Sequence, residues 1–439
     1  MTFVRPARRV LIAAASLSAL FVAAACGGGG GGEGAPEGGG TSAAAADFTK
    51  QGDIEVWQGK DTSGNFPKLI AQFNESHPNG KVTFHELPDS ADQQRQQMIQ
   101  NAQIKNPKMA VLSVDVVWTA EFAAKGYVEA LPPDMTTEGH LAAAVDAATY
   151  FDKLYAMPST TDGGLLYYRK DLLDKYQLEA PTTFDEMKTA CDKITAGEND
   201  SKLGCFAGQY NKYEGLTVNF DEAVHGAGGT ILGPDGKPNV ATPEATQGLQ
   251  TLTDWFKDGH IPKGAITWQE EQGRQAFQKG ELIFHRNWGY VYLLANKTDG
   301  SSEIAGKFDV APLPGITGAG VSSLGGHNYA VAKSAENKGT AIDFLKFMSS
   351  EEVQKSNTLA TSNSPTLEKL YTDPDVLKKL PFMDIQLKSV QGAAPRPKAV
   401  EYGDVTLAIQ DAAYGALQGQ TPPDAALQAL QTKLQTLIK

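Results

Sequence analysis

Residues 111–117, with the sequence VLSVDVV, decide the fold, because this run is apolar except at Ser113 and Asp115. A short β-branched run of this kind is typical of a strand buried on both faces of a sheet. Before it, the pattern predicts strands at 54–57 and 81–87, alternating with amphipathic helices at 67–76 and 89–105. This alternation predicts an α/β layer around a largely parallel sheet.

The same theme continues along the chain, with strands predicted at 165–168, 307–313 and 328–332. Thr183 and Glu186 fit a capping box that opens a helix ending near residue 194. Thr242 and Pro243 fit the N-cap and first residue of a helix to about residue 258, whose apolar face places Trp255 in the core. No period of 20 to 50 residues recurs, so two α/β lobes are favoured over a solenoid or propeller.

Composition describes a soluble globular protein. The chain has 439 residues, 41% of them hydrophobic, and a formal net charge of -12 from 39 Lys and Arg against 51 Asp and Glu. This length corresponds to two or three domain-sized units and excludes a small disulfide scaffold or a fully disordered chain. The acidic charge repels phosphate backbones, so nucleic acid is not an expected partner.

The N-terminal residues 1–25 have the pattern of a signal peptide. Arg5, Arg8 and Arg9 precede an apolar run that is shorter than the ~20 residues of a spanning helix and that ends in small residues. A retained membrane span is the weaker alternative. The pair Arg8 and Arg9 also fits a twin-arginine signal, so the export route stays open.

Residues 23–26, AAAC, resemble the bacterial lipobox, with Ala where Leu is usual three positions before the cysteine. The resemblance implies that Cys26 becomes the lipid-modified N-terminus of an extracytoplasmic protein anchored to the cell membrane. Ordinary cleavage that leaves a free Cys26 is the alternative. From Cys26 to residue 46 the chain is rich in Gly, Ala, Glu and Pro, which predicts a flexible tether.

Cys191 and Cys205 are the two remaining cysteines, and export to an oxidising compartment predicts a disulfide between them. No third cysteine or nearby histidine completes a metal-ligand set.

Motifs of the common catalytic sites are missing from the sequence. None of the seven histidines forms an H-E-x-x-H motif or a metal-type i,i+4 pair, and neither a P-loop nor a G-x-S-x-G elbow occurs. The Gly-rich stretches at 226–229 and 315–320 do not match a dinucleotide fingerprint. Glu270 and Glu271 fit a solvated helix start as well as a catalytic pair. We therefore expect no metal, no cofactor and no enzymatic activity.

Aromatic and hydrogen-bonding residues instead gather at predicted strand ends, a distribution that suits a sugar site. Sugars offer apolar C–H faces to aromatic rings and hydroxyl groups to carboxylates and planar donors. The candidates in this pattern are Trp57, Asp115, Trp118, Trp268, Glu270 and Trp288.

At this point the mature chain resembles the solute-binding lipoproteins (family 1) of bacterial carbohydrate ABC importers, and within them the branch that binds trehalose, maltose and related α-glucosides. Each matching block is short, and their number and order carry the resemblance. The blocks are IEVW at 54–57, LIAQFN at 69–74, DVVWTAEFA at 115–123, LLYYRKD at 165–171, PTTFDE at 181–186, AFQKG at 276–280, RNW at 286–288, GGH at 325–327, and RP at 396–397 with Tyr402.

The resemblance implies a type II periplasmic-binding-protein fold, in which two α/β lobes enclose a ligand cleft. Lobe 1 would comprise residues 47–157 and 311–350, and lobe 2 would comprise 158–310 and 351–439 with the C-terminal helices. A monomer would close on a mono-, di- or oligosaccharide and present it to the permease subunits of the importer.

The resemblance also implies roles for individual residues. Asp115, Asp162 and Glu270 would accept hydrogen bonds from sugar hydroxyls, although relatives often carry Asn at the position of Asp162. Trp288 would be the stacking platform and Arg396 a planar donor. The remaining candidates are Gly325 and Gly326, which would let the backbone approach the ligand, and, ranked lower, Glu55 and Trp268.

Several of these residues also have purely structural interpretations. Asp115 could cap the helix beginning near Thr119, Arg396 could be a surface arginine, and Gly325 and Gly326 could form a turn. Two other functions stay open: an anchored enzyme that acts on glycosides, and a solute-binding protein for a ligand that is not a sugar.

Overall fold

A computed structural model describes residues 46–438 of the chain. The predicted signal peptide, Cys26 and all of the predicted tether except its last residue lie outside the described residues. Within residues 46–438, no helix has the length and apolar character needed to cross a bilayer.

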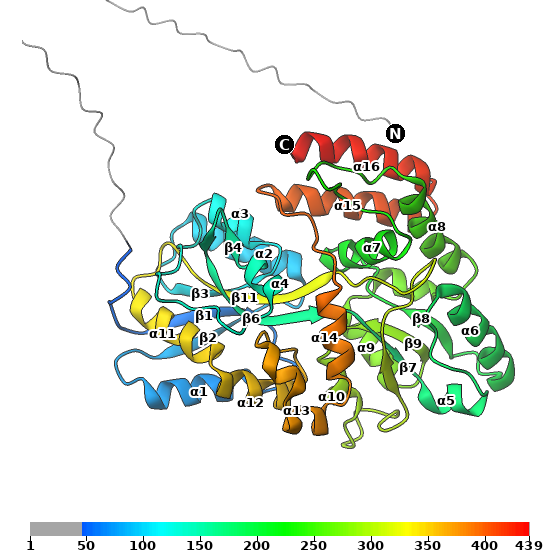
Figure 1. Cartoon of the computed structure of the whole chain (residues 1–439), viewed down its shortest axis with the longest axis horizontal. Coiled ribbons are helices and arrows are strands. Elements are labelled where there is room, and N and C mark those ends of the chain that lie inside the picture. The colour runs from blue at the N-terminus through cyan, green and yellow to red at the C-terminus, as the bar shows by residue number, and fades with distance from the viewer. Residues whose placement is uncertain (1–45, 439) are drawn as a thin grey trace, which may run out of the picture. The chain divides into compact units, whose positions relative to one another are not determined.

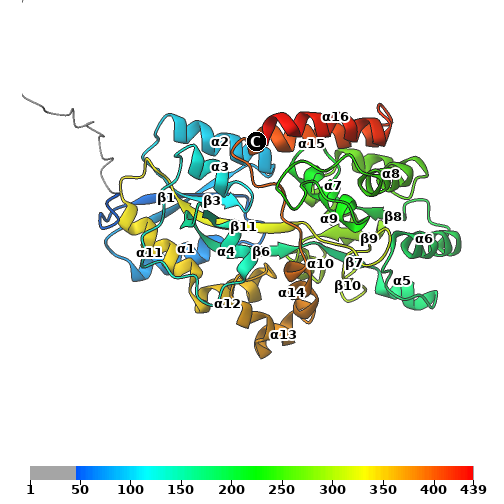
Figure 2. The ribbon, with the colours of Figure 1, turned by 45° about the horizontal axis from the view of Figure 1, so that its top comes forward.

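The first of the two main sheets has the strand order β2-β1-β3-β11-β6 (Figure 1). Its strands are β1 (Ile54–Gly59), β2 (Val82–Leu87), β3 (Met109–Asp115), β6 (Ala156–Gly163) and β11 (Leu324–Val331). Helices that pack on it include α1 (Phe66–Ser76), α2 (Ala91–Gln103) and α11 (Lys338–Ser349). Figures 1 and 2 show α1 and α2 on opposite sides of this sheet, so the apolar run in β3 is buried on both faces.

The second main sheet has the order β10-β7-β9-β8. Its strands are β7 (Leu165–Tyr168), β8 (Gly204–Ala207), β9 (Leu282–Asn287) and β10 (Asp309–Ala311). The helices in this part of the chain are α5 (Lys170–Lys175), α6 (Phe184–Glu198), α7 (Glu214–Gly226), α8 (Pro243–Lys257), the 3-10 helix η1 (Lys263–Thr267), α9 (Glu270–Gln278) and α10 (Val291–Ala295).

Shorter and C-terminal elements complete the described chain. They are α3 (Thr119–Ala124), α4 (Ala142–Ala147), the hairpin β4 (Thr149–Tyr150) and β5 (Lys153–Leu154), α12 (Glu351–Thr361), η2 (Glu368–Thr372), α13 (Pro374–Lys379), α14 (Met383–Gln391), α15 (Tyr402–Leu417) and α16 (Pro423–Leu437).

The prediction of a largely parallel sheet is confirmed for the first sheet, where β1, β2, β3 and β6 run in the same direction, and is wrong for the second. In the first sheet β1 is parallel to β2 and β3, but β11 is antiparallel to both β3 and β6. In the second sheet only β8 and β9 are parallel. Strand β11 is the exception in the first sheet because β6 leaves the first lobe for the second and β11 returns from it, so these two strands run in opposite directions.

Local sequence signals correspond closely to the observed helices. Thr183 and Glu186 form the predicted capping box of α6, and the Thr242 side chain accepts a hydrogen bond from the backbone N–H of Ala245. Trp255 of α8 is 6% exposed and packs edge-on against Phe184. These helix starts and the core position of Trp255 are confirmed.

Chain crossings between the lobes differ from the predicted boundaries. Strand β6 stays in the first sheet to Gly163, beyond the predicted limit at 157, and β11 enters at Leu324 rather than near 311. The assignment of 351–439 to lobe 2 also differs from the structure. Helix α12 packs on α11, and α14 on β6, whereas α15 and α16 pack on α7 and α8 (Figure 1). An amphipathic pattern identifies a buried face but not the lobe that buries it.

The predicted disulfide is present between Cys191 of α6 and Cys205 of β8, whose Cα atoms lie 5.4 Å apart. It fastens a helix to an outer strand of the second sheet across a separation of 14 residues. The bond therefore constrains the second lobe and does not cross the cleft.

Replacing both cysteines, as Cys191→Ser with Cys205→Ser, should lower the free energy of unfolding by about 3 kcal/mol, because a ring of this size restricts the unfolded chain. Urea unfolding followed by far-UV circular dichroism measures this loss. A reductant should shift the wild-type midpoint toward that of the variant and leave the variant unchanged; equal midpoints for the oxidised wild type and the variant would contradict the prediction.

Candidate ligand-binding cleft

A cavity of about 380 Å³ lies between residues of the two sheets. Its volume is in the range of pockets that hold small molecules, ~300 to 1,000 Å³. Seven of the nine predicted ligand-binding residues line it: Asp115, Asp162, Glu270, Trp288, Gly325, Gly326 and Arg396.

Strand directions explain why these residues meet. Asp115 is the last residue of β3 and is paired with His327, near the start of the antiparallel strand β11. Asp162 lies near the end of β6 and is paired with Gly325. Two strands that end at the cleft and one that begins there thus place their polar residues side by side.

Arg396 lies between α14 and α15 and is buried, with 3% of its surface exposed. Its Nη2 donates to Asp115 Oδ1 at 2.9 Å and to the carbonyl of Leu324 at 3.2 Å, and its Nη1 donates to Glu214 Oε1. Asp115 belongs to the first sheet and Glu214 opens α7 in the second lobe. One guanidinium therefore joins the two lobes inside the cleft.

The Glu214 carboxylate is held from several sides. The Tyr402 hydroxyl donates to its Oε1 and the Thr406 hydroxyl donates to its Oε2 at 2.8 Å. Burial raises the pKa of Glu214 to about 7; Arg396 opposes this rise and the negative charge of Asp115 adds to it. Burial opposes the charged form of Arg396, but the two carboxylates raise its pKa well above the usual value. Arg396 therefore keeps its positive charge while the Glu214 carboxyl group titrates near neutral pH.

Two further carboxyl groups, those of Asp162 and Glu270, line the cavity and form no ion pair with another of the described residues. Burial raises the pKa of Asp162 and of Glu270. Among the described residues, Asp162 Oδ1 has no hydrogen-bond partner. A buried polar oxygen of this kind is stabilised when a ligand donates a hydrogen bond to it.

Aromatic rings form one wall of the cavity. Trp288 follows β9 and is half-buried, and its carbonyl accepts a hydrogen bond of 2.8 Å from the Tyr167 hydroxyl. Tyr290 lines the cavity two residues later and donates to Glu271 Oε1 at 2.8 Å. A Cβ at Gly325 would lie 2.8 Å from the Trp288 ring, so only glycine leaves room for this ring beside β11.

The alternative interpretations of four predicted residues do not match the structure. Helix α3 has Trp118 as its N-cap and no side-chain cap, and Asp115 Oδ1 instead accepts from the backbone N–H of Val117 at 3.2 Å. Arg396 is buried, and Gly325 and Gly326 lie within β11 rather than in a turn.

Glu55 and Trp268, which were also predicted as ligand contacts, are not among the residues that line this cavity. Glu55 Oε2 accepts from the indole N–H of Trp57 at 3.1 Å, and Trp57 stacks on His85. Trp268 packs against the core of the second lobe. Trp118, like Trp57, is also a core residue. An aromatic residue near a strand end packs into the core as readily as it faces a ligand.

Sequence reasoning missed Glu214, Tyr290 and Tyr329, all of which line the cavity. The Tyr329 hydroxyl donates to Gln58 Oε1 at 2.6 Å, across the first sheet. Alternation along β11 places Tyr329 on the same side as Gly325 and His327, and this period is a signal that could have found it. Glu214 has no such signal, because its partners lie far along the chain.

Among residues 46–438, no group of three His, Cys, Asp or Glu side chains is arranged to hold a metal ion. The cleft instead offers carboxylate acceptors, cationic and amide donors, and aromatic faces. Such a set can bind a polar, uncharged molecule from two sides.

The chain belongs to the family of bacterial extracellular solute-binding proteins, whose model matches residues 58–355. A probable ABC transporter-binding protein of Deinococcus radiodurans is 33% identical over 401 residues, which cover 88% of this chain and 91% of that protein. The galactooligosaccharide-binding protein of Bacillus subtilis is 24% identical over 88% of this chain and 89% of its own.

Among solved structures, maltose-bound MalE3 of T. maritima matches with a TM-score of 0.84 at 32% identity, over 88% of this chain and all of that one (100%). The predicted periplasmic-binding-protein fold with two α/β lobes is confirmed by this match.

Replacing Glu214 by Gln should flatten the dependence of stability on pH. Between about pH 4.5 and 7 the folded chain holds the Glu214 proton and the unfolded chain has lost it, so the free energy of unfolding falls as pH rises. This group alone contributes a slope of at most about 1.4 kcal/mol per pH unit. Urea unfolding at pH 4, 5, 6, 7 and 8 gives the two profiles.

Glu138→Gln is a suitable control for this series, because the Glu138 side chain is exposed. Its profile should follow that of the wild type. Parallel wild-type and Glu214→Gln profiles would show that the Glu214 carboxyl does not titrate in this window.

Proposed function

We propose that this protein is the substrate-binding lipoprotein of an ABC sugar importer and that it captures an α-glucoside or oligosaccharide of the trehalose or maltose type. The observation that carries the proposal is the convergence of the Trp288 and Tyr290 rings with three carboxyl groups, those of Asp115, Asp162 and Glu270, on one cavity. Membership of the solute-binding family supports it, as do relatives named for galactooligosaccharide binding and for bound maltose.

Sugar chemistry fits this lining. A pyranose presents an apolar face that packs on an indole ring, and its edge carries hydroxyl groups that donate to carboxylates. A carboxyl group whose pKa is raised by burial can also donate a hydrogen bond to a sugar oxygen. Burial raises the pKa of Asp162 and of Glu270, and a hydroxyl group that donates to either carboxyl oxygen would offset part of the cost of burying it.

Binding, with no bond made or broken, would be the whole task of the protein. The cavity takes its lining from both lobes, so a ligand gains all of its contacts only when the lobes are closed. The closed form would then be the one that the permease subunits of the importer recognise. The protein would act as a monomer, held at the outer face of the membrane by the lipid on Cys26.

Calorimetric titration of the full chain with maltose, trehalose, a galactooligosaccharide and mannitol tests the proposal. We expect heat of binding with at least one α-glucoside. The absence of heat and of any thermal shift with every sugar would overturn it, and release of product from a chromogenic glucoside would favour a glycoside-acting enzyme instead.

Trp288→Ala should weaken sugar binding by a factor of about 10 to 100, because the platform for the apolar sugar face is lost. Trp268→Ala is the matched control, since it removes the same ring about 20 positions away and outside the cavity. Calorimetry on both variants measures the contrast. Equal losses of affinity would assign Trp288 to the core rather than to the ligand.

Cys26→Ser should move the protein from the membrane fraction to the soluble fraction of cells that express the full chain, because a serine cannot carry the thioether-linked lipid. Fractionation followed by mass spectrometry of the N-terminal peptide measures this. An unmodified cysteine in the wild-type peptide would contradict lipidation.

A further inference from the structure

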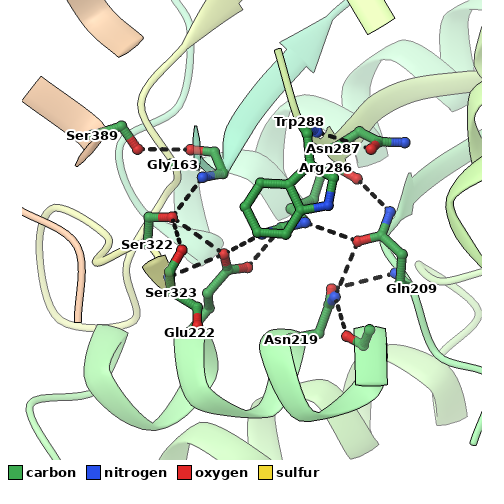
Figure 3. Close-up of polar contacts among 12 residues, drawn as sticks. Gly163, Gln209, Asn219, Glu222, Arg286, Asn287, Trp288, Ser322, Ser323 and Ser389 are labelled. Carbon is green, nitrogen blue, oxygen red and sulfur yellow. Dashed lines mark hydrogen bonds and ion pairs between the residues drawn. The ribbon is translucent and has the colours of Figure 1, made fainter. Parts of the chain in front are cut away.

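Behind the Trp288 ring lies a buried ion pair that the binding of a sugar does not itself require. Arg286 of β9 and Glu222 of α7 have side chains that are 2% and 9% exposed. Arg286 Nε donates to Glu222 Oε2 at 2.8 Å and its Nη2 donates to Oε1, which makes a two-pronged contact. Nη1 donates to Gln209 Oε1 at 3.0 Å, so the guanidinium is held in one orientation (Figure 3).

The Arg286 guanidinium lies over the face of the Trp288 ring. The Arg286 Cζ lies 3.9 Å from the centre of the indole, the geometry of a cation–π contact (Figure 3). Gly325 of β11 lies against an edge of the same ring. The position of Trp288 is therefore fixed at its face by Arg286 and at its edge by β11. The orientation of the proposed sugar platform therefore depends on the orientation of Arg286.

Glu222 connects this platform to the segments where the chain crosses between lobes. The backbone N–H of Ser323 donates to Glu222 Oε1 at 3.3 Å, and the Ser322 hydroxyl donates to the same oxygen at 3.5 Å. Ser322 and Ser323 directly precede β11, on the second crossing. The Ser322 Oγ also accepts from the backbone N–H of Gly164, which lies on the first crossing between β6 and β7.

Gly164 is so closely packed that there is no room for a side chain. A Cβ at this position would lie 2.7 Å from both Arg286 Nη2 and Glu222 Oε1, so the crossing backbone rests directly on the ion pair. The Ser389 hydroxyl of α14 donates to the carbonyl of Gly164 at 3.0 Å. Ala394, on the third crossing, accepts from the backbone N–H of Leu324 at 2.8 Å. The first two crossings thus contact the pair directly, and the third, between α14 and α15, is hydrogen-bonded to the second.

We propose that Arg286 and Glu222 are positioning residues that tie the Trp288 ring to the interlobe crossings, so that the ring and the hinge change position together. A sugar stacked on Trp288 would then favour the closed hinge through this pair as well as through its own contacts with both lobes. This inference rests on the proposed function, because it assumes that Trp288 contacts the ligand.

The pair has the properties of such a link. Both charges are buried, so each side chain must follow the other to keep its partner. The contact is two-pronged and fixes direction as well as distance. A rotation of the crossings that moves Ser323 would therefore displace Glu222. Arg286 would follow Glu222, and the Trp288 indole would follow Arg286.

The test replaces the pair by apolar side chains of similar size, as Glu222→Met with Arg286→Met, which leaves no unpaired buried charge. Asp171→Asn is the matched control, because Arg169 and Asp171 form a similar two-pronged pair at the far end of β7. Circular dichroism and thermal unfolding establish that the variants are folded. Small-angle X-ray scattering of the full chain, with and without saturating maltose, measures closure, and calorimetry measures affinity.

We expect the double variant to bind maltose at least tenfold more weakly and, at saturation, to lose most of the decrease in radius of gyration that maltose causes in the wild type. Its ligand-free radius should also differ from that of the wild type, whereas the control should match the wild type in all three measurements. A merely structural role for the pair would lower thermal stability but leave both radii unchanged.

A folded double variant whose ligand-free radius and maltose-induced closure equal those of the wild type would overturn the inference. If the radius of gyration of the wild type did not change with maltose, that result would count against the proposed function. The ligand-free radii of the wild type and the double variant would still test whether the pair connects Trp288 to the crossings. Should the double variant not fold, Glu222→Gln is the replacement and is judged by the same two radii.

Discussion

One buried positive charge, shared between two lobes, is the constraint on which the cleft depends. Arg396 is buried and so needs a counter-charge, and its two partners lie on different lobes, Asp115 at the end of β3 and Glu214 at the start of α7. A single side chain therefore links these two elements in this structure. The other residues of the cavity lie around this contact.

Strand direction determines which other residues meet in the cleft. Because β3 and β6 end at the cleft and β11 begins there, polar residues at three chain positions far apart become neighbours without any loop to carry them. The crossings emerge from the same strand ends. This is why the Arg286 and Glu222 pair can touch both the aromatic wall and the hinge.

Much of the fold was accessible from sequence, because period and capping are local. The elements β1 to β3, the capping box at Thr183 and the disulfide needed only residues close in the chain or a count of cysteines. The direction of β11 was not accessible, since a pattern of apolar residues has no direction. In the site, Glu214 was missed because its partner Arg396 is 182 positions away. Trp268 was included as a lower-ranked candidate because sequence alone does not show whether a ring faces the cavity or the core.

The position of β11 also shapes the order in which the chain can fold. This strand sits between β3 and β6, yet it follows the whole second sheet in the sequence. The second sheet is complete once residue 311 has been made, whereas the first remains split into two unjoined halves until residue 331 is available. Closing so long a loop is slow. The first sheet is thus the last of the two main sheets to be completed, and until then β3 and β6 each present an open edge to their surroundings.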